Sequence, residues 1–250
     1  MSDSKFIDTP EGRRIAYHKT DGAGPCVVFL GGLKSDMMGT KAVYLEDWAR
    51  VEGRAFLRFD YSGHGESSGS FAEGCIGDWH EDTLAAVTAL TEGPLIVVGS
   101  SMGGWQALLL ARQRPERIAG LIGIAAAPDF TEDGYWANFT EAQKQTLAEV
   151  GQVELPSDYM EPYVITRRMI EDGRKRLVLR EALDLPFPVR LLQGTADTAV
   201  STATAVRLLE HAQSPDMQLT LVKDADHRFS DARCLAMIVA AINEVTGREG

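Results

Sequence analysis

The chain has 250 residues, of which 44% are hydrophobic and 24% charged, and this composition excludes a disordered protein. A formal net charge of −11 argues against nucleic acid or an anionic membrane surface as the main partner. The cysteines, Cys26, Cys75 and Cys234, are scattered and lack metal-ligand spacing, which indicates reduced core residues. The first residues do not resemble a signal peptide and no apolar run reaches transmembrane length, so we expect a cytoplasmic protein without stable membrane insertion.

Short apolar runs alternate with helical patterns along the chain. Strands are predicted at 14–18, 26–30, 54–59, 95–98, 118–126, 189–192 and 219–222. Helices are predicted near 42–51, 78–90, 105–111 and 232–245. The first strand is expected to be antiparallel. Repeated β-then-α order predicts a single α/β domain over 1–250, with a mainly parallel central sheet and helices on both faces.

The stretch from Pro128 to Leu185 interrupts this alternation. It is polar and aromatic, and it shows helical periodicity but no convincing strand. A helical insertion between two strands of a sheet is expected to fold over their carboxyl ends as a small cap. Most of its aromatic side chains should pack the cap onto the body. A few should line an acyl-binding cavity, and Trp136 and Met160 are the candidates for contact with substrate.

The segment 99–103, Gly-Ser-Ser-Met-Gly, lies between an apolar β-branched run and a stretch rich in alanine and leucine. A strand, a sharp turn and a helix with Ser101 at the apex resemble the nucleophile elbow of the α/β-hydrolases. Side chains in place of Gly99 and Gly103 would collide with the neighbouring helix and strand, and Ser101 must adopt a strained backbone conformation. A structural Gly-Ser turn is the simpler alternative.

A serine nucleophile needs a base and an acid, and in this fold they follow in the order Ser, Asp or Glu, His. His227 follows the last predicted strand and is the candidate base, because one ring nitrogen can accept the proton of Ser101. Asp197 follows the preceding strand and is the candidate acid for the other ring nitrogen. Asp226 is its rival, although a sequence neighbour cannot easily turn back onto the ring of the next residue.

The oxyanion hole needs two backbone donors, and the amides of Leu33 and Met102 are the candidates. Many hydrolases carry His-Gly in the turn after the first buried strand. Here Gly31 replaces that histidine, which removes a side-chain contact and still allows the backbone function. A second tight loop, at 60–67, contains His64, which we interpret as structural.

Longer motifs make the resemblance more specific. They are GGLKSDMMGTKA at 31–42, RFDYSG at 58–63 and GSSMGGW at 99–105. The chain resembles the α/β-hydrolase branch that contains the palmitoyl-protein thioesterase and acyl-glucuronide esterase of animal mitochondria, with bacterial relatives. The resemblance implies a triad carried here by Ser101, Asp197 and His227, no metal or organic cofactor, and a small-molecule ester, an acyl thioester or an acylated protein as substrate. We expect no mitochondrial transit peptide, so the location and physiological substrate of the animal protein are not expected to transfer.

Two other classes of function stay open at this point. A carbon–carbon bond hydrolase or a haloperoxidase-like enzyme uses the same three residues. A catalytically idle protein could bind a small ligand in the same pocket. Serine at the apex disfavours haloalkane dehalogenase and epoxide hydrolase chemistry, which use aspartate there.

Overall fold

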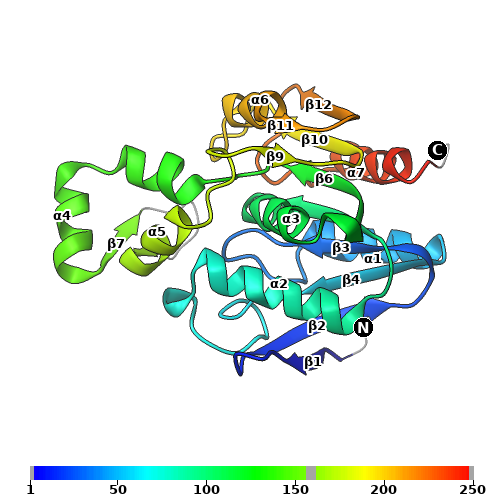
Figure 1. Ribbon diagram of the computed structural model, residues 1–250, viewed down its shortest axis with the longest axis horizontal. Coiled ribbons are helices and arrows are strands. Elements are labelled where there is room, and N and C mark those ends of the chain that lie inside the picture. The colour runs from blue at the N-terminus through cyan, green and yellow to red at the C-terminus, as the bar shows by residue number, and fades with distance from the viewer. Residues whose placement is uncertain (1–2, 156–161, 248–250) are drawn as a thin grey trace.

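The computed structural model describes residues 3–155 and 162–247, and within them an eight-stranded sheet forms the centre of the molecule (Figure 1). The strand order is β1-β2-β4-β3-β5-β6-β10-β12. The bounds are β1 Lys5–Asp8, β2 Arg14–Thr20, β3 Ala23–Leu30, β4 Arg54–Phe59, β5 Leu95–Ser100, β6 Ile118–Ile124, β10 Val189–Gly194 and β12 Met217–Val222. The pairs β1–β2 and β2–β4 are antiparallel and the others are parallel, which confirms the predicted mainly parallel sheet.

Helices cover both faces of the sheet. They are α1 Thr40–Val51, α2 Ile76–Leu90, α3 Met102–Gln113, α6 Thr202–His211 and α7 Ala232–Val245. Alternate residues of each central strand belong to two separate apolar clusters: Val27 of β3 packs in the cluster with α1 and α7, and Val28 packs in the cluster with α2 and α3. The strands are therefore apolar on both faces, as expected for a parallel sheet between helical layers. Helix α6 was not predicted.

The inserted segment, residues 128–185, connects β6 to β10. It contains a π-helix at Phe130–Trp136, α4 Glu141–Val150, β7 Gln152–Leu155, β8 Tyr163–Thr166, α5 Arg167–Arg174 and β9 Leu183–Asp184. Strands β7 and β8 pair antiparallel, and β9 pairs with β11 (Ala212–Gln213). The prediction of a segment without strands was therefore wrong. These strands are too short to show a period of two, because the longest has only four residues.

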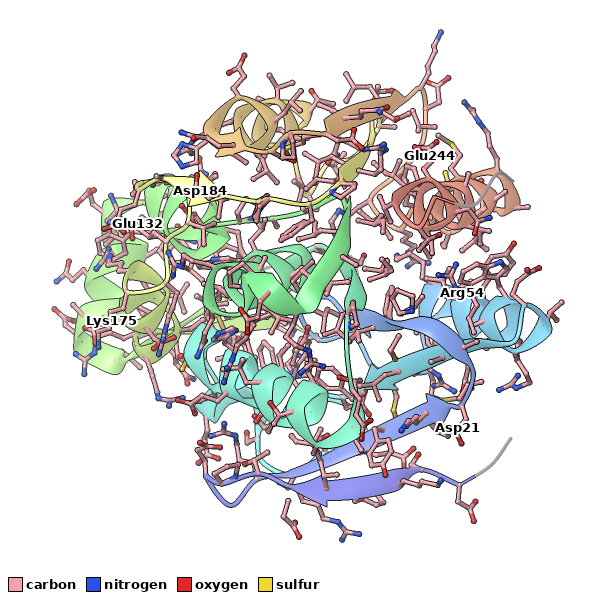
Figure 2. The ribbon with its side chains drawn as sticks, turned by 45° about the vertical axis from the view of Figure 1, so that its right-hand side comes forward. Asp21, Arg54, Glu132, Lys175, Asp184 and Glu244 are labelled. Carbon is pink, nitrogen blue, oxygen red and sulfur yellow. The ribbon has the colours of Figure 1, made fainter. Side chains whose placement is uncertain are left out.

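The inserted segment lies beyond the carboxyl ends of the sheet strands. In Figure 1, α4, β7 and α5 stand to the left of the sheet. In Figure 2, Glu132 and Lys175 of the inserted segment lie on the side opposite Asp21 and Arg54, which mark the beginnings of β3 and β4. The segment thus borders the edge at which parallel strands end, where ligands bind in open α/β sheets. Within the described residues no helix is both long enough and apolar enough to cross a membrane.

A buried carboxylate closes the base of the inserted segment. Asp129, at its beginning, is fully buried and accepts hydrogen bonds from the amides of Val178 (2.8 Å) and Leu179 (3.1 Å), near its end. Arg180 adds an ion pair at 3.2 Å. The beginning and the end of the inserted segment are therefore bonded to each other where the chain leaves the sheet and returns to it. This junction of Asp129 with Val178, Leu179 and Arg180 is called the neck below.

Candidate active site

Ser101 lies at the apex between β5 and α3. Its backbone has φ 55° and ψ −119°, a conformation that is strained for a residue with a side chain and costs about 1–3 kcal/mol. Its amide donates to the carbonyl of Ile124 in β6 at 2.9 Å, which holds the turn against the sheet. A Cβ atom on Gly99 would lie 2.3 Å from the carbonyl oxygen of Gly103, and one on Gly103 would lie 2.0 Å from that of Leu30. The predicted steric reason for both glycines is confirmed.

The structure brings Ser101, His227 and Asp197 together. His227 Nε2 lies 3.2 Å from Ser101 Oγ, and its Nδ1 lies 2.8 Å from Asp197 Oδ2. The three residues follow the carboxyl ends of β5, β10 and β12, which are parallel and therefore end at one edge of the sheet. An imidazole between a hydroxyl and a carboxylate can accept the hydroxyl proton, and the carboxylate fixes which ring nitrogen carries the other proton.

Asp197 is held as an ionised acceptor. Its side chain is fully buried; Oδ1 accepts the amides of Ala199 and Val200, each at 2.8 Å, and Oδ2 accepts Gln193 Nε2 at 3.0 Å. Burial by itself would raise the pKa of Asp197, but the hydrogen bonds from His227, Val200 and Gln193 outweigh it. The pKa of this carboxyl group therefore lies below its ordinary value.

Asp226 makes a different contact. Its Oδ1 accepts the amide of Phe229 at 3.1 Å, so its carboxylate closes the turn that carries His227. Lys41, near the start of α1, donates from Nζ to the carbonyl oxygen of Arg228 in the same turn. The loop that carries His227 is thus held by the side chain of its own Asp226 and by the side chain of Lys41 from a distant helix.

The loop after β3 lies directly beside Ser101. A Cβ atom on Gly32 would lie 3.4 Å from Ser101 Cβ, so the backbone approaches the serine as closely as ordinary packing allows. Leu33 is the next residue. Met102 is the first residue of α3, where backbone N–H groups have no partner within the helix. Both amides that sequence assigned to the oxyanion hole therefore belong to segments that adjoin Ser101.

The loop after β4 is hydrogen-bonded to the loop after β3, residues 31–39, which is called the oxyanion loop below because it carries the predicted donor Leu33. Asp60 accepts the amides of Met37 at 2.6 Å and Glu66 at 2.9 Å, and burial raises the pKa of Asp60 to about 6, although these bonds lower it. His64 is buried, as the structural interpretation requires. Its Nδ1 lies 3.1 Å from the carbonyl of Ser62, and its ring packs edge-on against Trp79. Burial lowers the pKa of His64 and favours the neutral ring.

Trp136 and Met160 are the two residues of the inserted segment that are predicted to contact substrate. Trp136 packs within the inserted segment, where Arg174 and Lys144 lie over its ring at 4.5 and 5.4 Å from the centroid. Met160 lies outside the described residues. A link between the inserted segment and the oxyanion loop is made by Lys34, whose Nζ donates to the carbonyl of Pro162 at 3.2 Å and lies 5.2 Å from the ring of Tyr163.

Comparison with known proteins settles the family. The model for the alpha/beta hydrolase fold matches residues 44–163. The mitochondrial palmitoyl-protein thioesterase ABHD10 of Rattus norvegicus is 36% identical over 242 residues, covering 96% of this chain and 81% of the rat protein. The chain belongs to the α/β-hydrolase family. Among solved structures, a protein from Agrobacterium vitis S4 superposes on this α/β-hydrolase with a TM-score of 0.93 at 38% identity, covering 97% of this chain and 98% of the other. Mouse alpha/beta hydrolase domain-containing protein 10 gives 0.91 at 34%, covering 98% and 99%.

Several residues of this α/β-hydrolase that shape the site were missed by sequence reasoning. Gln193 donates to Asp197, Lys41 holds the loop of His227, and Lys34 joins the oxyanion loop to the inserted segment. Gln193 could have been found from the sequence, because it is a polar residue at the end of a mostly apolar strand, immediately before the loop that carries Asp197. The two lysines gave none, because their partners are more than a hundred residues away.

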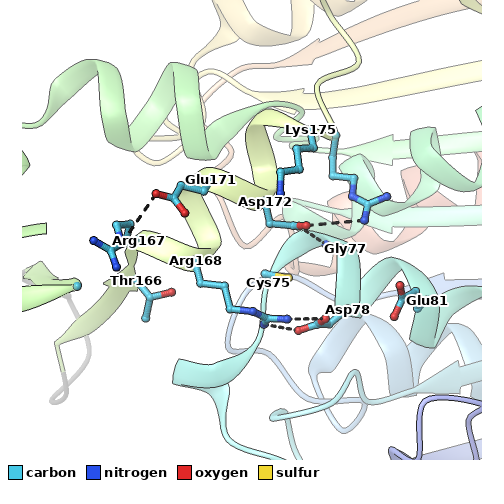
Figure 3. A pocket seen from close by; sticks show the side chains of 12 residues that line it. Cys75, Gly77, Asp78, Glu81, Thr166, Arg167, Arg168, Glu171, Asp172 and Lys175 are labelled. Carbon is cyan, nitrogen blue, oxygen red and sulfur yellow. Dashed lines mark hydrogen bonds and ion pairs between the residues drawn. The ribbon is translucent and has the colours of Figure 1, made fainter. Parts of the chain in front are cut away.

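A separate pocket of this α/β-hydrolase lies between α2 and α5 (Figure 3). It has a volume of about 540 Å³. Ser101, Asp197 and His227 are not among the described residues that line it. Its charges are mostly paired: Arg168 binds Asp78 at 2.5 and 2.9 Å, and Asp172 accepts the amide of Gly77 at 2.6 Å. These contacts fasten the inserted segment to the first turn of α2.

Proposed function

We propose that this α/β-hydrolase is a serine hydrolase that cleaves carboxylic esters or acyl thioesters through an acyl-enzyme on Ser101. The observation that carries the proposal is the hydrogen-bonded series Ser101, His227, Asp197, with the serine in a strained elbow conformation at the sheet edge. The relatives named palmitoyl-protein thioesterase support the choice of acyl thioesters and esters as substrates.

The reaction proceeds in two halves. His227 accepts the proton of Ser101 as Oγ attacks the carbonyl carbon, and the amides of Leu33 and Met102 stabilise the oxyanion. The bond to the alcohol or thiol breaks, and the leaving group takes the proton from His227. Water then attacks the acyl-enzyme as His227 accepts one of its protons, the ester bond to Ser101 breaks, and His227 returns the proton to Ser101 Oγ, which releases the carboxylic acid and the free serine. No step requires a metal or an organic cofactor.

The inserted segment has the role of a cap in this proposal. It borders the strand ends at which Ser101, Asp197 and His227 meet, and Lys34 joins it to the oxyanion loop. Trp136 and Met160 are proposed as contacts for the acyl chain. A cytoplasmic location is likewise our proposal, and the rat thioesterase named above is mitochondrial by its name.

Labelling and turnover of serine variants test the assignment. Ser101→Ala should abolish reaction with a fluorophosphonate probe and lower hydrolysis of p-nitrophenyl esters and acyl thioesters by several orders of magnitude, because no acyl-enzyme can form. The neighbouring variant Ser100→Ala should retain probe labelling. Labelling that persists in Ser101→Ala and disappears in Ser100→Ala contradicts the mechanism.

A further inference from the structure

Gln193 is a fully buried polar side chain on an apolar face of β10. Val189 and Leu191, which precede it on the same face of the strand, pack in the apolar cluster with α2 and α3. Among residues 3–155 and 162–247, Gln193 Oε1 has no hydrogen-bond partner. A buried polar atom without a partner lowers stability, so packing alone favours an apolar residue of this size. The contribution of the glutamine must therefore come from its Nε2 atom.

The Nε2 atom of Gln193 joins three points of the segment 194–200, which carries Asp197 and is called the acid loop here. It lies 3.0 Å from Asp197 Oδ2, 3.0 Å from the carbonyl oxygen of Val200 and 3.2 Å from that of Gly194. An oxygen in the place of Nε2 would face three acceptors, so the surroundings fix the orientation of the amide. Its two N–H groups serve three acceptors, and the ionised carboxylate of Asp197 is the strongest of them.

The contact with Asp197 involves the same oxygen that faces His227. Oδ2 accepts His227 Nδ1 at 2.8 Å and Gln193 Nε2 at 3.0 Å, whereas Oδ1 accepts two backbone amides. A carboxylate oxygen has two lone pairs, and with Gln193 at one of them the other is directed at the imidazole. Gln193 is thus the donor to Oδ2 that takes no part in proton transfer.

The backbones of the acid loop and of the loop after β12 are joined without the glutamine. The amide of Thr195 donates to the carbonyl of Val222 at 2.9 Å, and the amide of Ala196 donates to that of Ala225 at 3.0 Å. These bonds keep the two loops together in the absence of the Gln193 side chain. Loss of its Nε2 donor should therefore release the carboxylate of the acid and leave the two loops in contact.

We propose that Gln193 is a positioning residue that acts through Asp197, because its Nε2 atom holds Oδ2 where this oxygen accepts His227 Nδ1. The proposal rests on the proposed function, since Asp197 matters to turnover only if His227 is the base. A fully buried side chain does not contact the substrate. The donor on Gln193 should therefore support the rate of the chemical steps and leave the binding of substrate unchanged.

Kinetics of two buried glutamine variants test this role. Gln193→Met keeps the length of the side chain and removes both polar atoms. With the full-length chain and a p-nitrophenyl ester, kcat and kcat/KM should both fall about 10- to 100-fold, the size of one hydrogen bond to a charged group. An effect on KM with kcat unchanged would place the role in substrate binding and overturn the proposal.

Gln106→Met in α3 is the matched control. Gln106 is also fully buried, its Nε2 donates to the carbonyl of Ile76 at 3.1 Å, and its Oε1 has no partner within the described part of the chain. It makes no bond to Ser101, Asp197 or His227 among those residues, so kcat should stay within threefold of the wild type. If the control lowers kcat as much as Gln193→Met, the effect belongs to the core in general and the proposal is refuted.

A double-variant cycle shows whether the effect passes through Asp197. Asp197→Asn removes the ionised acceptor on which Gln193 acts, so adding Gln193→Met to it should lower kcat by no more than twofold. A fluorogenic ester makes the low rates measurable, and circular dichroism shows that each variant is folded. The same 10- to 100-fold loss in both backgrounds would mean that Gln193 acts on the fold and not on the acid. If Gln193→Met does not fold, Gln193→Leu takes its place in the cycle, and failure of both to fold likewise shows a structural role.

The outcomes separate this proposal from the proposed function. If the wild type neither hydrolyses esters nor reacts with the serine probe, the serine-hydrolase mechanism fails. If the wild type does both, and Gln193→Met is folded and as active as Gln106→Met, the mechanism stands and only the role of Gln193 is refuted.

Discussion

Replacing Asp197 by asparagine tests the hydrogen bonding of the site most directly. In the wild type, Oδ1 accepts two backbone amides, from Ala199 and Val200, and Oδ2 accepts His227 Nδ1 and Gln193 Nε2. The asparagine oxygen must take the place of Oδ1, since an NH₂ group there would face two donors. The NH₂ group then occupies the place of Oδ2 and points at His227 Nδ1.

This orientation determines the expected size of the effect. Because the NH₂ group is a donor, Nδ1 of His227 must act as the acceptor. The single proton of the neutral ring then lies on Nε2, and Nε2 can no longer accept the proton of Ser101. An asparagine that imposes the wrong tautomer in this way lowers kcat by about 10⁴. A factor of 10⁴ equals about 5.4 kcal/mol of transition-state stabilisation, at about 1.36 kcal/mol for each factor of ten.

The assay is hydrolysis of a p-nitrophenyl ester under saturating substrate, with circular dichroism to show that Asp197→Asn remains folded. Asp226→Asn is the matched control, because it removes the neighbouring carboxylate, whose Oδ1 accepts a turn amide from Phe229 and not His227 Nδ1. It should lower kcat less than tenfold. A folded Asp197→Asn enzyme with kcat within tenfold of the wild type refutes the tautomer argument, and a reversal of the two variants transfers the role of the acid to Asp226.

Three further outcomes are expected. Gly103→Ala should lower the free energy of unfolding by at least about 3 kcal/mol in urea titrations, because its Cβ would lie 2.0 Å from a backbone oxygen; Gly134→Ala, whose Cβ would lie 3.6 Å from its nearest neighbour, should change it by less than about 1 kcal/mol. Lys34→Met should lower kcat/KM about three- to tenfold with little loss of stability, because it removes the bond from the oxyanion loop to Pro162; an unchanged kcat/KM would show that the loop holds its position alone. The lowered pKa of Asp197 means that its carboxylate stabilises the fold above about pH 4 and that this contribution is lost as the pH falls through the lowered pKa. The difference in unfolding free energy between wild type and Asp197→Asn should therefore shrink from pH 6 to pH 3.

Sequence reasoning located the three residues at the centre of the site because of one geometric rule. Ser101, Asp197 and His227 each follow an apolar strand, and parallel strands end at the same edge of a sheet. Their order along the chain then limited the choice of partners. Strand β4 and helix α7 were predicted with the bounds that the structure shows, since each is strongly patterned along its whole length.

The residues that support the site could not be found in the same way. Asp60 and Lys41 act through hydrogen bonds to other loops, and a single sequence does not show which loops meet. Helix α6 was missed although Ser201 caps it, because only Ala205 and Leu208 face the core and its apolar stripe is narrow. Strands β7 and β8 stabilise each other by pairing, which short local patterns do not reveal.

The neck at Asp129 bears on how such an enzyme can change over evolution. Strands β6 and β10, which the inserted segment connects, are hydrogen-bonded neighbours, with Ile124 opposite Leu192. The carboxylate of Asp129 joins the two crossings just outside the sheet. Insertions, deletions or exchange of everything beyond this junction therefore need not disturb strand pairing or the spacing of Ser101, Asp197 and His227. The sheet with its covering helices must therefore be conserved as a unit, whereas the inserted segment beyond the neck can be exchanged as a module.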